Sequence, residues 1–198
     1  MNPKYSIIIP SHNGEPHIRK CLDSVACQWY RNYELIVVCD RCEDNTEEIA
    51  KTYRARTITV DYGRDGLSTN AGLDAAQGEY ILFLDDDDWW LHEFVLEQID
   101  SHITPFVDVL YFSFIWKGRG YCVQSPERTY IAVWNKCWRK DFIGSTRFPE
   151  RKNWSDEDFN RMMSYKKGHR VYWDMPMYYY NFMREGSINW IAANGGEA

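Results

Sequence analysis

Apolar residues in the first 85 positions of the chain follow two alternating patterns. Short unbroken apolar runs, such as "SIIIP" and "ELIVVC", are typical of strands that are buried on both faces of a sheet. Between these runs, apolar residues recur three or four positions apart, which is typical of amphipathic helices. The strands predicted in this way cover 5–10, 33–40, 56–60 and 79–85, and the helices cover 17–28, 47–53 and 68–78. This alternation predicts a parallel sheet with helices on both faces.

The second half of the chain has a different pattern. Helices are predicted at 92–103, 133–143 and 155–165, and strands at 107–116, 169–173 and 177–182. Ser155 or Asp156 is expected to cap the last of these helices. Because no repeat, linker or low-complexity segment interrupts the 198 residues, we expect one domain.

Three polar segments follow the predicted strands of the first half: "PSHNG", "CDRCEDNT" and "DDDDWW". In parallel sheets ligands bind beyond the carboxyl ends of the strands, so these segments are expected to meet at one pocket. The last one holds Asp85, Asp86, Asp87 and Asp88. Divalent cations such as Mg²⁺ prefer carboxylate oxygens and often complete their shells with phosphates. The segment therefore predicts a metal–diphosphate site, with a solvated acidic turn as the alternative.

Composition narrows the function. The net charge of −6 weighs against non-specific nucleic-acid binding, and the 16% of aromatic residues suits a site for sugar rings as well as ordinary packing. The chain has no apolar run of about 18 residues and no signal-peptide pattern at its start. We therefore expect a cytoplasmic site of action, with peripheral contact to a membrane left open. Cys39 and Cys42 form a single CxxC, a weak metal or redox signal.

Several segments, taken in order, resemble the family 2 glycosyltransferases of GT-A fold. They are "SIIIPSHN", "LIVVCDRCEDNT" and "GLSTNAGLDAAQGEYILFLDDDDWW", followed by "VWNKCWRKDFI", "RFPE", "SDEDFN" and "MYYYNFMREGSI", which resemble bacterial members that build polysaccharides. The resemblance implies an α/β, Rossmann-like GT-A fold with a mostly parallel central sheet flanked by helices. It implies a nucleotide-binding half at about 1–90 and a smaller acceptor and catalytic-base half at about 91–198. These halves would form a single domain, or one domain of a longer polypeptide.

The resemblance also implies site residues. Those implied for binding the nucleotide-sugar are Pro10, Ser11, Asn13, Asp40, Arg64, Asn70, Asp85 and Asp86. Among them, Asp40 would hydrogen-bond the uracil ring and Asp85 the ribose. Asp87 would ligate Mn²⁺ or Mg²⁺, with Asp85 as a second candidate ligand.

Two departures from the family pattern concern this site. The usual "DDGS" reads "CDRC" here, which retains Asp40. The segment "GLSTNAG" is two residues shorter than usual and lacks an arginine. Arg64 could supply that positive charge, or could be an exposed turn residue.

Transfer with inversion needs a base for the acceptor hydroxyl. The family's acidic pair aligns on Asp156, with Asp158 or Glu157 as the alternatives. All three acids could instead be favourable charges in the first turn of a helix. Trp89, Trp90 and Trp154 could stack on a sugar or pack in the core.

The implied reaction moves one sugar from a nucleotide-sugar, with a UDP-sugar favoured, to a glycan, a lipid-linked sugar or a protein. A nucleotidyltransferase on a related fold is an alternative, although "PSHNGEP" has one glycine and lacks Lys and Arg. A non-catalytic nucleotide-sugar-binding module is the other alternative. We expect neither a nucleic-acid partner nor a transmembrane segment.

Overall fold

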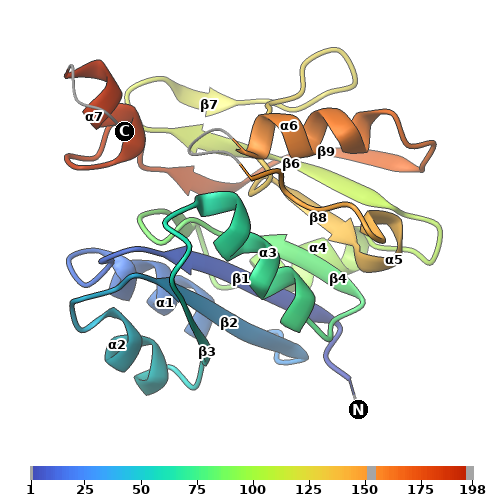
Figure 1. The fold of residues 1–198 in the computed structure, drawn as a ribbon. Helices are drawn as coiled ribbons and strands as arrows, with labels where there is room; N and C mark the ends of the chain where they lie inside the picture. The colour runs from blue at the N-terminus through green and yellow to red at the C-terminus, as the bar shows by residue number, and fades with distance from the viewer. Residues whose placement is uncertain (1, 151–154, 195–198) are drawn as a thin grey trace.

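The computed structural model describes residues 2–150 and 155–194, whose strands form one mixed sheet (Figure 1). The strands are β1 (Tyr5–Ser11), β2 (Tyr33–Asp40), β3 (Arg56–Val60), β4 (Tyr80–Phe83), β5 (Trp89–Trp90), β6 (Val109–Trp116), β7 (Gly120–Cys122), β8 (Lys136–Arg139) and β9 (Arg170–Tyr180). Their order is β3-β2-β1-β4-β8-β6-β9-β5, and β7 pairs with β6 outside this path. The helices are α1 (Ile18–Ala26), α2 (Thr46–Thr52), α3 (Asp65–Ala75), α4 (Val95–His102), α5 (Lys140–Ile143), α6 (Ser155–Ser164) and α7 (Ile188–Ala193).

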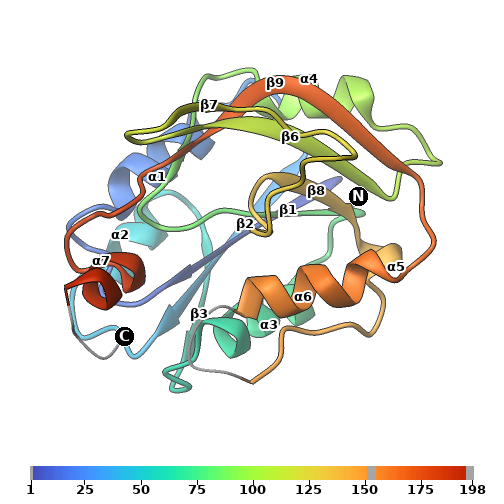
Figure 2. The same ribbon diagram turned by 90° about the horizontal axis from the view of Figure 1, so that it is seen from above.

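The first half of the sheet is parallel, as predicted. Strand β1 pairs in parallel with both β2 and β4, and β2 with β3. The second half is mixed, because β8 runs antiparallel to both β4 and β6, while β9 runs parallel to β6. Seen from above, β6, β7 and β9 arch over β1 and β2, so the sheet is curled (Figure 2). The prediction of an α/β fold with a second half of different character is confirmed.

Alternate residues of β1 bury opposite faces of the sheet. Ile7 and Ile9 belong to the apolar cluster that includes the buried residues of α1, α2 and α4, whereas Ile8 belongs to the cluster that includes those of α3 and α6. All three isoleucines are fully buried, as expected for strands covered on both sides. Gly72 lets α3 lie close to β1, because a Cβ at this position would collide with Ile8 Cγ2. The carboxyl end of β1 is thus fixed by tight packing.

Two predictions for the second half are wrong in detail. Residues 133–143 were expected to form one helix, but Lys136–Arg139 form β8 and Lys140–Ile143 form α5. Cys137 and Trp138 are both buried but belong to apolar clusters on opposite faces of the sheet, as neighbouring residues of a strand do. Because both faces of this short strand are covered, its apolar residues do not alternate with polar ones, and the sequence pattern could not be distinguished from that of a helix.

The two closing strands predicted at 169–173 and 177–182 are one strand, β9. Its pairing with β6 shifts in register where Pro176 lies opposite Ser113. Proline lacks the backbone N–H that pairing within a sheet requires, so in strands it occurs at such irregularities. Because of Pro176, the sequence pattern predicts two strands where the structure has one. The short strands β5 and β7 and the helix α7 were not predicted.

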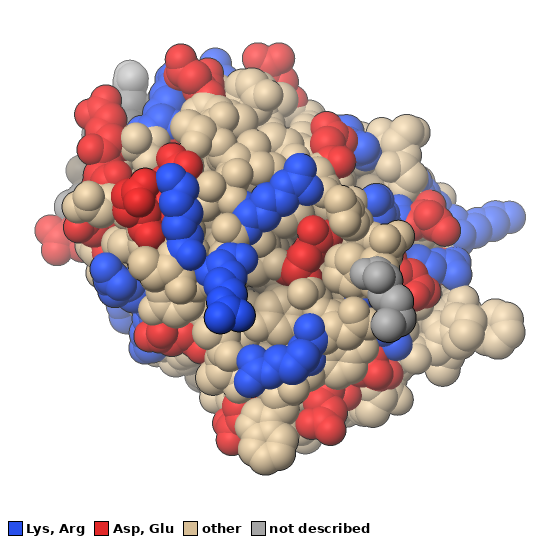
Figure 3. Space-filling model, turned by 90° about the horizontal axis from the view of Figure 1, so that it is seen from below, with Lys and Arg blue, Asp and Glu red and all other residues tan. Residues whose placement is uncertain are grey.

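The surface carries both signs of charge. On the face seen in Figure 3, Lys and Arg side chains are interspersed with Asp and Glu side chains. This face therefore lacks the uniform basic surface that phosphate backbones require. No helix in the described part of the chain is both long and apolar enough to span a bilayer. The expected cytoplasmic site of action stays a prediction.

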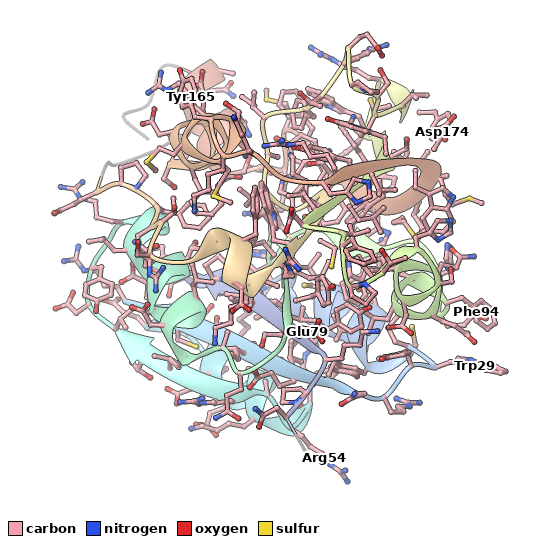
Figure 4. The ribbon with its side chains drawn as sticks, turned by 90° about the vertical axis from the view of Figure 1, so that its right-hand side faces the viewer. Trp29, Arg54, Glu79, Phe94, Tyr165 and Asp174 are labelled. Atoms are coloured by element: carbon pink, nitrogen blue, oxygen red, sulfur yellow. The ribbon has the colours of Figure 1, made fainter. Side chains whose placement is uncertain are left out.

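The right-hand end of the molecule in Figure 1 holds the amino ends of β1, β2 and β4. Figure 4 looks onto this end, with Glu79 just before β4. At its edge the rings of Trp29 and Phe94 lie side by side, with centroids 5.0 Å apart. The polar segments that the sequence singled out lie at the other end of these strands.

Candidate active site

A cavity of about 640 Å³ opens at the carboxyl ends of β1, β2 and β4. The predicted site residues that line it are Pro10, Ser11, Asp40, Arg64, Asp85, Asp86, Asp87, Asp156 and Glu157. Side chains from the second half of the chain, among them Tyr130, Trp134, Tyr180 and Arg184, line the same cavity. The cavity thus brings together the strand-end segments of the first half and the start of α6.

Asp88 anchors the acidic segment inside the protein. It is 1% exposed, and its backbone N–H donates to the carbonyl of Asp85 at 3.1 Å, which closes a turn. Its carboxylate accepts hydrogen bonds from the Tyr178 hydroxyl at 2.6 Å and from the Asn181 N–H at 2.7 Å. Burial and the charge of Asp87 raise the pKa of Asp88, and these two donors oppose the rise. Asp88 therefore ties the turn to β9 and the residues after it.

Asp86 is held from the other side. The Ser11 hydroxyl donates to its Oδ2, and His17 Nε2 lies 3.1 Å from its Oδ1. Asp86 thus links the acidic segment to the loop after β1. Its expected contact with ribose or phosphate stays a prediction, because both carboxylate oxygens already have partners in the protein.

Asp85 and Asp87 are half-buried at the cavity. Burial, followed by the charges of Asp88 and Asp156, raises the pKa of Asp85 well above its usual range. Burial and the charge of Asp86 also raise the pKa of Asp87, whereas Arg184 lowers it. Arg184 Nε lies 2.6 Å from Asp87 Oδ2. Two carboxylates whose ionised form is disfavoured present a place where added positive charge is stabilising.

The carboxylates of Asp85 and Asp87 could hold Mn²⁺ or Mg²⁺ if phosphates complete the coordination shell of the metal. The described residues contain no group of three or more His, Cys, Asp or Glu side chains placed to hold a metal by themselves. Mg²⁺ is commonly held by one or two carboxylates, with substrate phosphates and water completing its shell. Asp87 and Asp85 match that arrangement, so the residues suit a metal that arrives with a diphosphate.

Asp40 fixes the loop that leads into α3. Its Oδ1 accepts from the N–H groups of Tyr62 at 2.8 Å and Gly63 at 3.0 Å. Its Oδ2 accepts from the Arg64 N–H at 3.2 Å and the Ser68 hydroxyl at 2.6 Å. Burial alone would raise the pKa of Asp40, but the hydrogen bonds outweigh it and lower the pKa. Asp40 shapes this wall of the cavity, and its contact with a base stays a prediction.

Asn13 and Asn70 lie outside the set of described residues that line the cavity. Asn13 Oδ1 accepts from the Glu43 N–H at 2.8 Å, joining two loops. The Asn70 side chain donates to the Phe148 carbonyl at 2.8 Å and accepts from the Phe148 N–H at 2.9 Å. In this structure Asn13 links two loops, and Asn70 links α3 to the backbone of Phe148.

The candidate bases separate clearly. Asp156 and Glu157 line the cavity, and Asp156 Oδ2 accepts from the Val133 N–H at 3.2 Å. Asp158 instead forms an ion pair with Arg161 one turn along α6. The geometry favours Asp156 and Glu157 over Asp158.

Of the tryptophans that could stack on a sugar or pack in the core, Trp89 and Trp90 do not line the cavity. Trp89 stacks on Tyr179 with ring centroids 4.2 Å apart, and Lys20 Nζ covers the Trp89 ring at 3.1 Å. Trp90 is buried at 3% exposure. Trp154 lies outside the described residues.

Arg184 and Tyr180 are cavity residues that sequence reasoning missed, although both lie in the quoted segment "MYYYNFMREGSI". The signal available was an arginine four residues beyond an aromatic strand. Lys136 was also missed, because the sequence predicts a helix over 133–143 and assigns this lysine no role.

Comparison with known proteins identifies the family of this chain. Residues 6–168 match the sequence profile of the family described as Glycosyl transferase family 2. The chain belongs to glycosyl transferase family 2. Curated relatives include glycosyltransferase GlyA of Streptococcus pneumoniae, 25% identical over 96% of this chain, and the uncharacterized glycosyltransferase EpsJ of Bacillus subtilis, 42% identical over 66% of it. The chain spans 32% and 38% of the lengths of these two relatives.

Solved structures of other proteins share the fold. Residues 1–349 of TarS from S. aureus, in complex with UDP-GlcNAc, are 27% identical with a TM-score of 0.80, over 93% of this chain and 60% of that one. Glucosyl-3-phosphoglycerate synthase from Mycobacterium tuberculosis, in a complex with Mn²⁺ and UDP, is 16% identical with a TM-score of 0.68, over 96% of this chain and 75% of that one. At that identity the likeness concerns the fold alone. The expected GT-A fold is confirmed.

Proposed function

We propose that this family 2 chain transfers one sugar from a UDP-sugar to a hydroxyl group of a glycan acceptor by direct displacement, with inversion at the anomeric carbon. The observation that carries the proposal is that Asp85 and Asp87, which follow β4, line one cavity with Asp156 of α6. Direct displacement needs a stabilised diphosphate on one side of the anomeric carbon and a base on the other. Membership of the family and the UDP-GlcNAc complex of TarS support the same reading.

The donor side of the cavity is assigned to the strand ends of the first half. Pro10, Ser11 and Arg64 line the cavity beside Asp40, and we place the nucleotide against them. Asp87 would hold Mn²⁺ or Mg²⁺, with Asp85 as the second candidate ligand and as the ribose contact. When bound, the metal acts as a Lewis acid that stabilises the leaving diphosphate. Arg184, already beside Asp87, is placed to pair with the same phosphates.

The acceptor side is assigned to the second half. Asp156 would take the proton of the attacking hydroxyl group, and the Val133 N–H holds one of its oxygens in place. Tyr130, Trp134 and Tyr180 line the cavity and offer apolar ring faces to a sugar. TarS of Staphylococcus aureus, named a poly(ribitol-phosphate) β-N-acetylglucosaminyltransferase, is 29% identical over 92% of this chain, and its name supports a polymeric acceptor with free hydroxyl groups. Lipid-linked sugars and proteins remain the other acceptor classes.

The family match favours sugar transfer over nucleotidyl transfer, and the products of the two reactions distinguish them. A sugar transferase releases UDP from a UDP-sugar, whereas a nucleotidyltransferase produces or consumes pyrophosphate. A non-catalytic binding module would bind the nucleotide-sugar and release neither product.

A donor screen tests the proposal. UDP-GlcNAc, UDP-glucose, UDP-galactose and GDP-mannose are each added with and without Mn²⁺, and the melting temperature and the release of nucleoside diphosphate are measured. A ligand at 100 times its Kd should stabilise the folded state by about 2.7 kcal/mol, a readily measured shift. We expect at least one UDP-sugar to stabilise the protein and to release UDP. No shift with any nucleotide, with or without metal, would refute the donor site.

A further inference from the structure

Lys136 at the start of β8 is a buried lysine to which neither the family match nor the sequence analysis gives a role. Its side chain is 1% exposed, whereas lysines are almost never fully buried unless they are paired. Burial lowers the pKa of Lys136 to about 7, and the charge of Asp156 opposes this shift. Because burying a lysine is energetically unfavourable, it needs contacts within the protein that stabilise it here.

The Lys136 amine closes the connection between β7 and β8. Nζ donates to the carbonyl of Tyr130 at 2.9 Å, to the carbonyl of Ala132, and to Asn135 Oδ1 at 2.8 Å. Three acceptors match the three N–H groups of an ammonium. Asn135 is itself fully buried, and its amide makes its side-chain hydrogen bond through the Oδ1 that faces Lys136, while its Nδ2 makes none among the described residues.

The backbone segment that Lys136 binds, residues 130–135, also contacts the candidate base Asp156. Val133 lies between Ala132 and Asn135, which both accept hydrogen bonds from Lys136. The Val133 N–H donates to Asp156 Oδ2 at 3.2 Å. The carbonyl of Ile131, in the same connection, accepts from Asn160 one turn further along α6. Tyr130, Ala132 and their neighbours also form the cavity wall beside Asp156.

We infer that Lys136 is a positioning residue for the transfer reaction: the hydrogen bonds of its Nζ hold residues 130–135 together so that the Val133 N–H orients the carboxylate of Asp156. The inference rests on the proposed role of Asp156. Lys136 does not touch the substrate in this account. Its removal should therefore leave donor binding intact and slow the step that uses the base.

The test compares Lys136→Met with Lys166→Met. Lys166 is the matched control, because its Nζ also donates to two backbone carbonyls, those of Phe142 at 2.8 Å and Ile143 at 2.6 Å, away from the described cavity lining. With UDP-GlcNAc and Mn²⁺, we expect Lys136→Met to lower kcat for UDP release by about 10- to 100-fold, the scale of a small misplacement of a catalytic group. The Kd for UDP with Mn²⁺ should change less than about twofold, and Lys166→Met should retain kcat.

Two further variants make each outcome decisive. Asn135→Leu removes one acceptor of Lys136 and should lower kcat by about three- to tenfold at unchanged Kd. It decides the matter if Lys136→Met does not fold, and a wild-type kcat in Asn135→Leu then overturns the inference. Asp156→Asn distinguishes a failure of the role inferred for Lys136 from a failure of the role proposed for Asp156. If Asp156→Asn is slow while Lys136→Met retains kcat, or if Lys166→Met slows equally, this inference alone is overturned. If Asp156→Asn retains kcat, the assignment of the base fails, and the inference fails with it.

Discussion

Arg184 Nε lies 2.6 Å from Asp87 Oδ2, so the expected metal ligand is paired with a cation of the protein itself. The two residues are 97 positions apart and meet because Asp88, next to Asp87, is bound by Tyr178 and Asn181 of the segment that leads to Arg184. The ion pair partly neutralises a carboxylate whose pKa burial and Asp86 would otherwise raise further.

Arg184→Met should therefore separate metal binding from nucleotide binding. Without the guanidinium, Mn²⁺ alone should bind Asp87 more tightly, because it no longer competes with Arg184. UDP with Mn²⁺ should bind about three- to tenfold more weakly, because a charge-assisted hydrogen bond to phosphate is lost. Calorimetric titration with Mn²⁺ alone, and then with UDP and Mn²⁺, measures both. Arg161→Met is the control, since Arg161 pairs with Asp158 and not with a cavity carboxylate. Weaker binding of Mn²⁺ alone would contradict the account.

The strands of the first half could be predicted from sequence because their signals are local. Strands β1, β2 and β4 each contain a continuous apolar run, and the polar residues after parallel strands lie at one edge of the sheet. The pairing of Arg184 with Asp87 was not predictable in this way, because it depends on β9 returning beside β6 and on a register shift at Pro176. Lys136 was missed for a related reason: β8 is buried on both faces, so its short apolar pattern did not distinguish strand from helix.

Asp156→Asn tests the base. The substitution keeps the size of the side chain and an acceptor oxygen for the Val133 N–H, but the amide cannot take a proton. We expect kcat for transfer to fall by about 10²- to 10⁴-fold, the usual contribution of general base catalysis. Binding of UDP with Mn²⁺ should be unchanged. Asp158→Asn, measured beside it, should retain activity because Asp158 pairs with Arg161. A reversed order of the two variants would show that the base is misassigned.

Asp40 should make stability depend on pH in the acid range. Its pKa is lowered in the folded state, so the folded protein binds fewer protons there than the unfolded chain. Its stabilising contribution is thus fully present above the ordinary carboxyl pKa of about 4 and is lost as pH falls through the lowered value. At pH 6, Asp40→Asn should be less stable than the wild type by about 1–3 kcal/mol, since charge-assisted hydrogen bonds are weakened. Urea unfolding between pH 6 and pH 3 measures the difference, which should shrink as pH falls. A difference that grows towards pH 3 would contradict the assignment.

The central claim is that Asp87 holds a divalent metal on which a nucleoside diphosphate binds. Calorimetric titration of UDP into the wild type and into Asp87→Asn, each with and without Mn²⁺, tests it most directly. The account predicts that Mn²⁺ tightens UDP binding to the wild type at least about tenfold, which is about 1.4 kcal/mol. It predicts that Asp87→Asn loses this gain, with urea unfolding of both proteins as the control that the variant is folded. Equal tightening by Mn²⁺ in both proteins, or UDP binding indifferent to Mn²⁺ in the wild type, would contradict it.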